Sequence, residues 1–241
     1  MMRKSTLFLM SLSLLISCGG GGGGGGGSKE KAQVSNEEIR NTKPGSGAIL
    51  DNEDILKGDA NTSTEQPAGE DAGVPTAAIT FNTNIKTYKF TASGRKKIDA
   101  AADLIKQVVS SEEFKNKVLN HRYNGKRQFA NNNGLTNKQI YNKILAGAEK
   151  LKPTKDNEMD LELQLYTDND SNTVGYTYPN TNRVWMNSKY FNKNTPALVT
   201  TNMMHEWLHK LGFGHDVEAT KKRPYSVPYA VGYIVRDLAK K

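Results

Sequence analysis

Residues 205–216, near the C-terminal end, restrict the local fold more than any other stretch of the chain. They read His-Glu-Trp-Leu-His-Lys-Leu-Gly-Phe-Gly-His-Asp and hold three of the four histidines. On an α-helix, His205 and His209 lie one turn apart on the same face. Gly212 can adopt a left-handed backbone conformation, which ends the helix and turns the chain so that His215 approaches the same point. The spacing therefore predicts a helix, a glycine turn and three imidazoles around one metal ion.

Three histidines beside one carboxylate form the donor set of a catalytic zinc site. Structural zinc usually has four protein ligands, whereas a catalytic site has three and keeps one position open. Glu206 follows the first histidine and points off the ligand face, where its carboxylate can act as a general base. Solvated histidines on a surface helix are the plain alternative, but His121 is the only histidine outside the cluster. We therefore expect Zn²⁺ as the cofactor.

The segment that leads into this cluster has the composition of a buried helix. From residue 196 onward, apolar side chains cover much of the helical circumference, as in a helix packed inside a small domain. They are Ala197, Leu198, Met203, Met204, Trp207, Leu208 and Leu211. The pattern predicts a buried metal-binding helix.

The cluster resembles the signature of the metzincin clan of zinc metallopeptidases, His-Glu-x-x-His-x-x-Gly-x-x-His. Reprolysin-type (adamalysin-like) members also carry an aspartate after the third histidine, as Asp216 does here. The resemblance implies an α+β fold: a single zincin-like domain in which a small mixed sheet accompanies an active-site helix and a C-terminal helix. It also implies hydrolysis of peptide bonds, with Glu206 as general base and with zinc ligands His205, His209 and His215.

One departure from the family concerns the floor of the metal site. Metzincins carry a methionine-containing turn beneath the metal, and this chain has no methionine after Met204. In the segment Tyr225–Tyr229, Val227 takes the place of the methionine in the family's Met-x-Tyr pattern. Tyr229 matches the tyrosine of that pattern, so it is the first candidate to stabilise a developing oxyanion, and Tyr225 is the second. Packing of both tyrosines in the turn is an equal alternative.

The same resemblance implies where a substrate would bind. In metzincins, an edge strand above the metal binds extended substrate by strand addition. Gly175 and Tyr176 are the candidate substrate-binding residues, because the short, glycine-containing segment Gly175–Tyr178 precedes the metal helix. An ordinary edge strand is the alternative. The expected substrate is a protein or peptide.

Two other functions fit the same metal site. One is a non-enzymatic, lipid-anchored binding protein that keeps zinc for stability, although a structural site has no need of the base Glu206. The other is a zinc hydrolase of a cell-envelope substrate, which the sequence does not separate from an endopeptidase. A gluzincin arrangement, with Glu218 as third ligand, is disfavoured because Glu218 follows His215 too closely.

The N-terminal residues 1–17 have the pattern of a lipoprotein signal peptide. Two basic residues precede a short apolar run, Leu7 to Ile16, that is too brief to span a bilayer. The following Ser17-Cys18 completes a sequence that resembles the lipobox of bacterial lipoproteins, which implies lipid attachment at Cys18. We expect a protein anchored to a membrane of the bacterial cell envelope. An ordinary secretory signal is the alternative. Cys18 is the only cysteine, so no intramolecular disulfide can form.

An acidic tether precedes a basic domain. Residues 18–75 contain nine glycines in a row and then a polar stretch without periodicity, which predicts a disordered tether. Residues 28–75 carry five basic against ten acidic residues, and residues 76–241 carry 26 against 15. The basic charge can favour acidic proteins or anionic surfaces, but solvated lysines on helix faces are the preferred interpretation for most of it. No recognition motif accompanies the charge, so no nucleic-acid partner is expected. The tether could also contact the domain and inhibit it.

Residues 76–241 suffice for one domain with one core, which we expect to be a monomer. Hydrophobic periodicity predicts these elements: a strand or hairpin at 79–90, helices at 93–120 and after Thr136, strands at 159–167, 174–178 and 183–187, the metal helix, and a last helix from about Tyr229. The segment Asp168–Asn172 has the spacing of a calcium loop, but Thr173 and Pro179 replace the required glycine and glutamate. A polar turn is the preferred interpretation.

Overall fold

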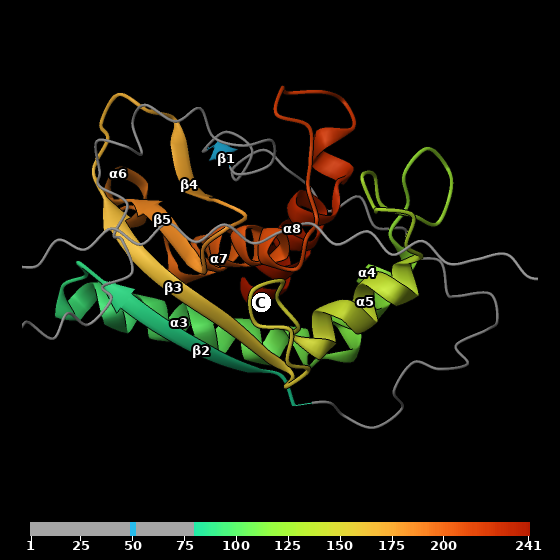
Figure 1. Ribbon diagram of the computed structural model, residues 1–241, viewed down its shortest axis with the longest axis horizontal. Helices are drawn as coiled ribbons and strands as arrows, with labels where there is room; N and C mark the ends of the chain where they lie inside the picture. Colours follow the sequence, from blue (N-terminus) through green and yellow to red (C-terminus); the bar gives the residue numbers. More distant parts are fainter. Residues whose placement is uncertain (1–48, 52–79) are drawn as a thin grey trace, which may run out of the picture. The chain divides into compact units, whose positions relative to one another are not determined.

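A mixed sheet of five strands forms one layer of the domain, in the order β1-β4-β5-β3-β2 (Figure 1). β2, β3 and β5 run parallel to one another, β4 is antiparallel to β5, and β1 is antiparallel to β4. The strands are β1 (Ile49–Asp51), β2 (Asn82–Tyr88), β3 (Glu158–Tyr166), β4 (Thr173–Thr177) and β5 (Arg183–Asn187). The expected small mixed sheet is confirmed, and with it the α+β class.

The computed structural model describes residues 49–51 and 80–241. The predicted signal peptide, the lipid-attachment residue Cys18 and the glycine run lie outside these residues. Within the described part, every helix is too short or too polar to cross a bilayer.

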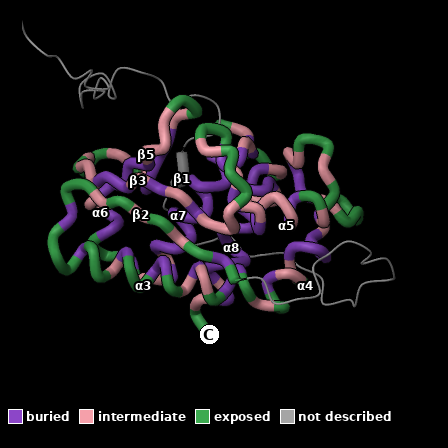
Figure 2. The backbone as a smooth tube through the Cα atoms, turned by 60° about the horizontal axis from the view of Figure 1, so that its bottom comes forward, coloured by how far each residue is buried: buried purple, intermediate pink, exposed green. Residues whose placement is uncertain are grey.

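Helices pack against one face of the sheet and enclose the main core with it. The helices are α3 (Ala92–Val109), α4 (Glu112–Asn120), α5 (Asn137–Ala146), α6 (Ser188–Phe191), α7 (Pro196–Lys210) and α8 (Val227–Ala239), with a short 3₁₀ helix η1 (Arg223–Tyr225). Alternate residues of β3 point into the core, and the surface helix α3 shows alternating buried and exposed turns (Figure 2). The core joins these strand residues to α3, α7 and α8 through Met159, Leu161, Leu163, Ile98, Ile105, Trp207, Leu208, Val231 and Ile234.

The helix predicted for residues 93–120 is instead two helices. α3 ends at Val109 and α4 begins at Glu112, with two serines between them. Ser111 caps α4, because its hydroxyl accepts a hydrogen bond from the backbone N–H of Phe114 at 3.1 Å. The prediction failed because the apolar positions on both sides kept a helical spacing, while the paired serines offered the backbone other hydrogen-bond partners.

The helix predicted after Thr136 is confirmed. Thr136 and Gln139 form a reciprocal capping box at its start. At its end Gly147 has φ +69°, and a Cβ there would lie 2.3 Å from the carbonyl oxygen of Glu158. The same close approach brings the end of α5 against the start of β3.

The strands predicted at 159–167, 174–178 and 183–187 are confirmed to within one residue, but β4 is not the edge of the sheet. β1 pairs along its outer side, with Ile49 opposite Tyr176 and Leu50 opposite Gly175. β1 lies inside the stretch that was predicted to be a disordered tether. Its three residues lie within a polar sequence with isolated apolar residues, so no periodicity marked them.

The segment Asp168–Asn172 is a polar turn, as preferred from the sequence. The Asp168 carboxylate accepts hydrogen bonds from the backbone N–H groups of Asp170 (3.2 Å) and Ser171 (3.1 Å). The Lys189 ammonium donates to the carbonyls of Asn169 (2.7 Å) and Ser171 (3.0 Å). A cationic group of the chain itself thus meets the carbonyls of this loop.

Candidate metal centre

α7 carries the first two histidines, and the turn that follows it carries the third. Thr195 caps the helix and Pro196 occupies its first position. Gly212 follows the helix with φ +95°, and the N–H of Phe213 donates to the carbonyl of Leu208 at 3.0 Å. The predicted left-handed glycine turn is therefore present. It returns the chain so that His215 faces α7.

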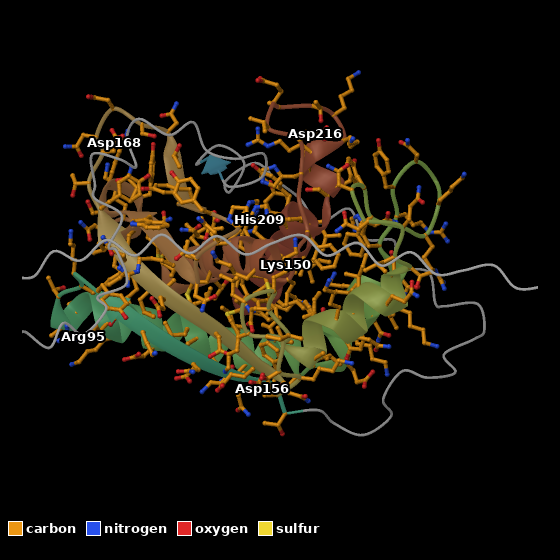
Figure 3. All side chains as sticks on the ribbon, in the orientation of Figure 1. Arg95, Lys150, Asp156, Asp168, His209 and Asp216 are labelled. Atoms are coloured by element: carbon orange, nitrogen blue, oxygen red, sulfur yellow. The ribbon has the colours of Figure 1, made fainter. Side chains whose placement is uncertain are left out.

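The three imidazoles converge through the same ring atom. His205 Nε2 lies 3.1 Å from His215 Nε2 and 3.2 Å from His209 Nε2. Two nitrogens bound to a tetrahedral zinc ion are about 3.3 Å apart, given the usual Zn–N bond length. The observed spacing fits one small cation held by all three Nε2 atoms. Figure 3 shows His209 in the middle of the domain, below the loop that carries Asp216.

Hydrogen bonds on the far side of two rings set their tautomers. His209 Nδ1 lies 2.8 Å from the carbonyl oxygen of Phe213, and His215 Nδ1 lies 2.9 Å from the carbonyl oxygen of Asp216. A carbonyl only accepts, so both Nδ1 atoms carry the proton and both Nε2 atoms present a lone pair. His205 Nε2 can donate its one proton to only one of them. A metal ion satisfies all three lone pairs at once, so these residues fit a bound metal.

Burial keeps the imidazoles in the neutral form that binds metals. Burial, followed by the neighbouring His215, lowers the pKa of His209 to about 3. Burial, the other two imidazoles and the Arg223 guanidinium also lower the pKa of His205 well below its usual value. These two imidazoles are therefore neutral before a cation binds.

Glu206 is fully buried on the same helix. Neither of its carboxylate oxygens has a hydrogen-bond partner among the described residues. Burial raises its pKa well above the usual value, and the Lys210 ammonium one turn further on opposes this shift. A desolvated carboxylate with free oxygens is a stronger base than one in water. This is the property required of the predicted general base.

Tyr229 lies directly against the histidines. Its ring centroid is 4.5 Å from that of His205 and 4.7 Å from that of His215, edge to face in both cases. Its hydroxyl accepts hydrogen bonds from Arg223, through Nε at 2.8 Å and through Nη2. Val227, expected at the methionine position, is buried in the main core. Tyr225 packs instead against Tyr123 and His121, with centroids 5.4 Å and 6.3 Å away.

Asp216 holds the loop after the third histidine in place. Its carboxylate accepts from the Thr220 hydroxyl at 2.7 Å and from the Asn131 amide at 3.1 Å, and it pairs with Lys222 at 3.2 Å. These contacts, led by the bond from Thr220, lower its pKa to about 2. Asp216 therefore anchors this loop, and it is not part of the group of His205, His209 and His215 that could hold a metal ion.

Gly175 and Tyr176 face opposite sides of the sheet. A Cβ on Gly175 would lie 2.5 Å from the Asn202 amide oxygen, so β4 passes close to α7 one turn before the metal ligands. Tyr176 points the other way, where its ring stacks on Trp185 at 5.3 Å. Of the two, only Gly175 is brought next to the metal helix.

Two buried cations near the site were not expected from the sequence. The Lys210 ammonium, on α7, bonds to the Thr177 hydroxyl and to the carbonyls of Tyr178 (3.2 Å) and Thr181 (2.6 Å). Burial lowers its pKa to about 8. A lysine inside an apolar helix, one turn after Glu206, was a usable signal. No sequence pattern indicated that Arg223 would be buried, because the following Pro224 and Tyr225 predicted only a turn.

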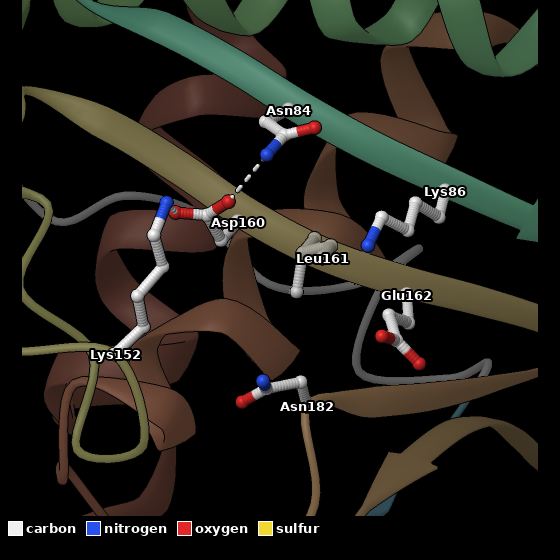
Figure 4. A pocket seen from close by; sticks show the side chains of 7 residues that line it. All are labelled: Asn84, Lys86, Lys152, Asp160, Leu161, Glu162 and Asn182. Carbon is white, nitrogen blue, oxygen red and sulfur yellow. Dashed lines mark hydrogen bonds and ion pairs between the residues drawn. The ribbon is translucent and has the colours of Figure 1, made fainter.

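A second group of potential ligands lies elsewhere. Asp156, Glu158 and Asp160 also offer three oxygens close together, but the Lys152 ammonium already pairs with Asp160 at 2.6 Å and Asp156 at 3.2 Å. Beside it is a pocket of about 180 Å³, where the Asn84 amide bonds to Asp160 at 2.7 Å (Figure 4). Charges of both signs line the pocket, and none of the three histidines does.

Comparison of the chain with protein families, with curated proteins and with solved structures gave no match in any of the three. The metal centre is therefore described from its own geometry.

Proposed function

We propose that this chain is a zinc-dependent endopeptidase with a metzincin-like domain. The observation that carries the proposal is the convergence of three imidazoles, with Nε2 atoms 3.1 Å and 3.2 Å apart, beside a buried carboxylate without hydrogen-bond partners among the described residues. His205, His209 and His215 would hold the zinc ion. Bound there, zinc would polarise a peptide carbonyl and lower the pKa of water, so that the water would lose a proton readily and attack the carbonyl.

Glu206 provides the proton transfer of the proposed reaction. One of its carboxylate oxygens takes the proton of the attacking water and then delivers it to the amine nitrogen of the leaving group. Its raised pKa supports the first step, because a desolvated carboxylate accepts a proton more readily than one in water. The Lys210 ammonium, one turn further along α7, opposes this rise.

The proposed substrate is an extended peptide bound along the outer side of β4. β1 already shows how that side pairs with an antiparallel segment, with Leu50 opposite Gly175. A peptide would take the place of β1 by strand addition. Gly175 permits the close approach of β4 to α7, so the bound peptide would run beside the metal helix. The lipid on Cys18 would hold this activity at a membrane of the bacterial cell envelope.

One observation favours a second candidate function, a lipid-anchored binding protein with a structural metal. His205 and Glu206 have no exposed surface, only 6% of His215 is exposed, and His209 is half-buried. A metal so enclosed contributes to stability whether or not a substrate reaches it. The two candidates differ in what the loss of Glu206 does.

A peptide library separates the two functions. The full-length chain, loaded with zinc, should cleave members of the library, as read by mass spectrometry. Cleavage should stop with a chelator and return with added zinc. Glu206→Gln should keep one equivalent of zinc but lose cleavage at least 100-fold, in line with loss of a general base.

The matched control for this variant is Glu149→Gln, which alters another buried carboxyl that contacts α7 through the Trp207 indole. It should cleave normally if it folds. Full zinc occupancy without cleavage of any peptide would support the binding protein instead.

A further inference from the structure

The metal site has an aromatic floor. Tyr229 lies in the first turn of α8, and its ring meets His205 of α7 and His215 of the following loop at 4.5 Å and 4.7 Å. These two histidines come from different elements, so nothing in α7 alone sets their relative orientation. One rigid ring that touches both can do so. Val227, which takes the place of the family's methionine, lies two residues earlier and is buried in the main core.

Close packing of two helices places this ring. A Cβ on Gly232 would lie 3.3 Å from the Thr201 carbonyl oxygen and 3.8 Å from the Cβ of His205. α8 therefore approaches α7 closely at Gly232, three residues after Tyr229. Because Tyr229 is only 1% exposed, its ring has little room to move away from the imidazoles.

Arg223 fixes the other end of the tyrosine. Its Nε donates to the Tyr229 hydroxyl at 2.8 Å, and its Nη1 donates to the Val217 carbonyl at 3.0 Å. Val217 follows His215 by two residues. A buried guanidinium is stable only when such acceptors meet it. Arg223 thus joins the floor of the site to the segment that carries the third ligand.

We infer that Tyr229 is a positioning residue that orients His205 and His215 for metal binding, and that Arg223 anchors it. In this role the tyrosine acts through the two imidazoles and not through contact with substrate. The inference rests on the metal binding of the proposed function and not on its peptidase activity.

The test measures metal affinity directly. Zn²⁺ affinity of the full-length chain is obtained by competition with a chelating indicator, and Co²⁺ absorption reports the ligand geometry. Tyr229→Leu removes the ring, so we expect a 10- to 100-fold weaker metal affinity and an altered cobalt spectrum, the range that outer-sphere partners usually contribute. Tyr229→Phe and Arg223→Lys should each weaken affinity a few-fold, with a smaller spectral change.

Tyr233→Phe and Tyr233→Leu are the matched controls, because this buried tyrosine lies one turn further along α8 and packs against Tyr229 at 6.0 Å. They should leave metal affinity within a factor of two. If Tyr229→Leu does not fold, Tyr229→Phe and Arg223→Lys decide the question.

Three results would overturn the inference. The first is a folded Tyr229→Leu variant with unchanged metal affinity. The second is unchanged affinity in both Tyr229→Phe and Arg223→Lys. The third is a loss of kcat in Tyr229→Phe that exceeds its loss of metal affinity, which would make the hydroxyl a catalytic group. A wild-type chain that binds zinc but cleaves no peptide would contradict only the proposed peptidase activity. A chain that binds no zinc would contradict both that activity and the positioning role of Tyr229.

Discussion

Two clusters in the described part of the chain bring three potential ligands together, and they differ in charge, burial and partners. In the histidine cluster His205 and His215 are buried and His209 is half-buried, and hydrogen bonds to carbonyls turn two of the ring lone pairs inward. The acidic cluster of Asp156, Glu158 and Asp160 is partly exposed, and the Lys152 ammonium already pairs with its carboxylates. Spacing alone does not make a metal site. The decisive difference is that a lysine of the chain itself already pairs with the acidic cluster, whereas no such ammonium occupies the point between the three imidazoles in the described part of the chain.

The largest expected effect is the loss of a histidine ligand. His209→Ala should weaken zinc affinity about 100- to 1000-fold, because each ligand of a zinc site contributes roughly 3 to 4 kcal/mol. Asp160→Asn, in the acidic cluster, should leave both the affinity and the stoichiometry of one zinc per chain unchanged. Competition with a chelating indicator measures both. Equal losses in the two variants would show that the comparison is mistaken.

The fourth histidine tests burial without metal binding. Burial lowers the pKa of His121 from 6.5 to about 4. Between pH 6.5 and pH 4, His121 is therefore protonated in the unfolded chain but neutral in the folded chain. The free energy of unfolding decreases as the pH is lowered through this range. The loss is about 1.4 kcal/mol per pH unit and about 3 kcal/mol over the window.

His121→Phe removes this titration while it keeps a ring stacked on Phe129, whose centroid is 4.1 Å away. Urea unfolding of both proteins at a series of pH values, with equal zinc, gives the difference. As the pH falls from 6.5 to 4, the unfolding free energy of the variant should rise relative to that of the wild type. Above pH 7 the difference between the two free energies should be constant. A constant difference at all pH values would rule out a buried neutral histidine.

Two lysines differ in the same way: Lys210 is buried, whereas Lys152 lies at the partly exposed acidic cluster. The buried Lys210 ammonium holds the turn between β4 and β5 through the carbonyls of Tyr178 and Thr181. Lys210→Met leaves those acceptors without their donor, at a cost of about 2 to 4 kcal/mol in unfolding free energy. Lys152→Met, at the exposed acidic cluster, should shift the melting temperature far less. Thermal unfolding of both variants checks the order, and a reversed order would contradict it.

These contrasts explain which features the sequence predicted. Local patterns were enough for the capping box at Thr136, the glycine turn at Gly212 and the alternation of β3, because each depends on residues a few positions apart. The convergence of His205, His209 and His215 was predictable for the same reason.

Features that join distant segments were not predictable from local patterns. Lys210 meets Thr181 across 29 positions of the chain. Arg223 lies only six positions before Tyr229, but no sequence pattern marked its contact with the tyrosine hydroxyl, which forms through the turn between η1 and α8. The pairing of β1 with β4 joins residues more than a hundred positions apart, through backbone atoms that every residue has. Tyr229 was singled out from a family pattern, but its two imidazole contacts depend on the packing of α8 against α7.

The smallest expected effect concerns β1, the one described segment of the predicted tether. If a peptide substrate must displace β1 from β4, weakening β1 should raise kcat/KM. Leu50→Pro removes a backbone donor and disfavours the strand. The pairing involves only three residues and shifts register between Leu50 and Asp51. Its loss is worth about 1 kcal/mol, or about a fivefold gain in kcat/KM.

Leu56→Pro, outside β1, is the matched control and should leave the rate unchanged. Initial rates on one peptide from the library, at concentrations well below KM, measure the effect. Zinc affinity should stay constant in both variants, because the strand contributes no ligand. A gain confined to Leu50→Pro would mean that β1 and the substrate compete for one edge of β4. Equal rates in all three proteins would mean that peptides reach the metal by another path, and the outer side of β4 would then lose its assigned role.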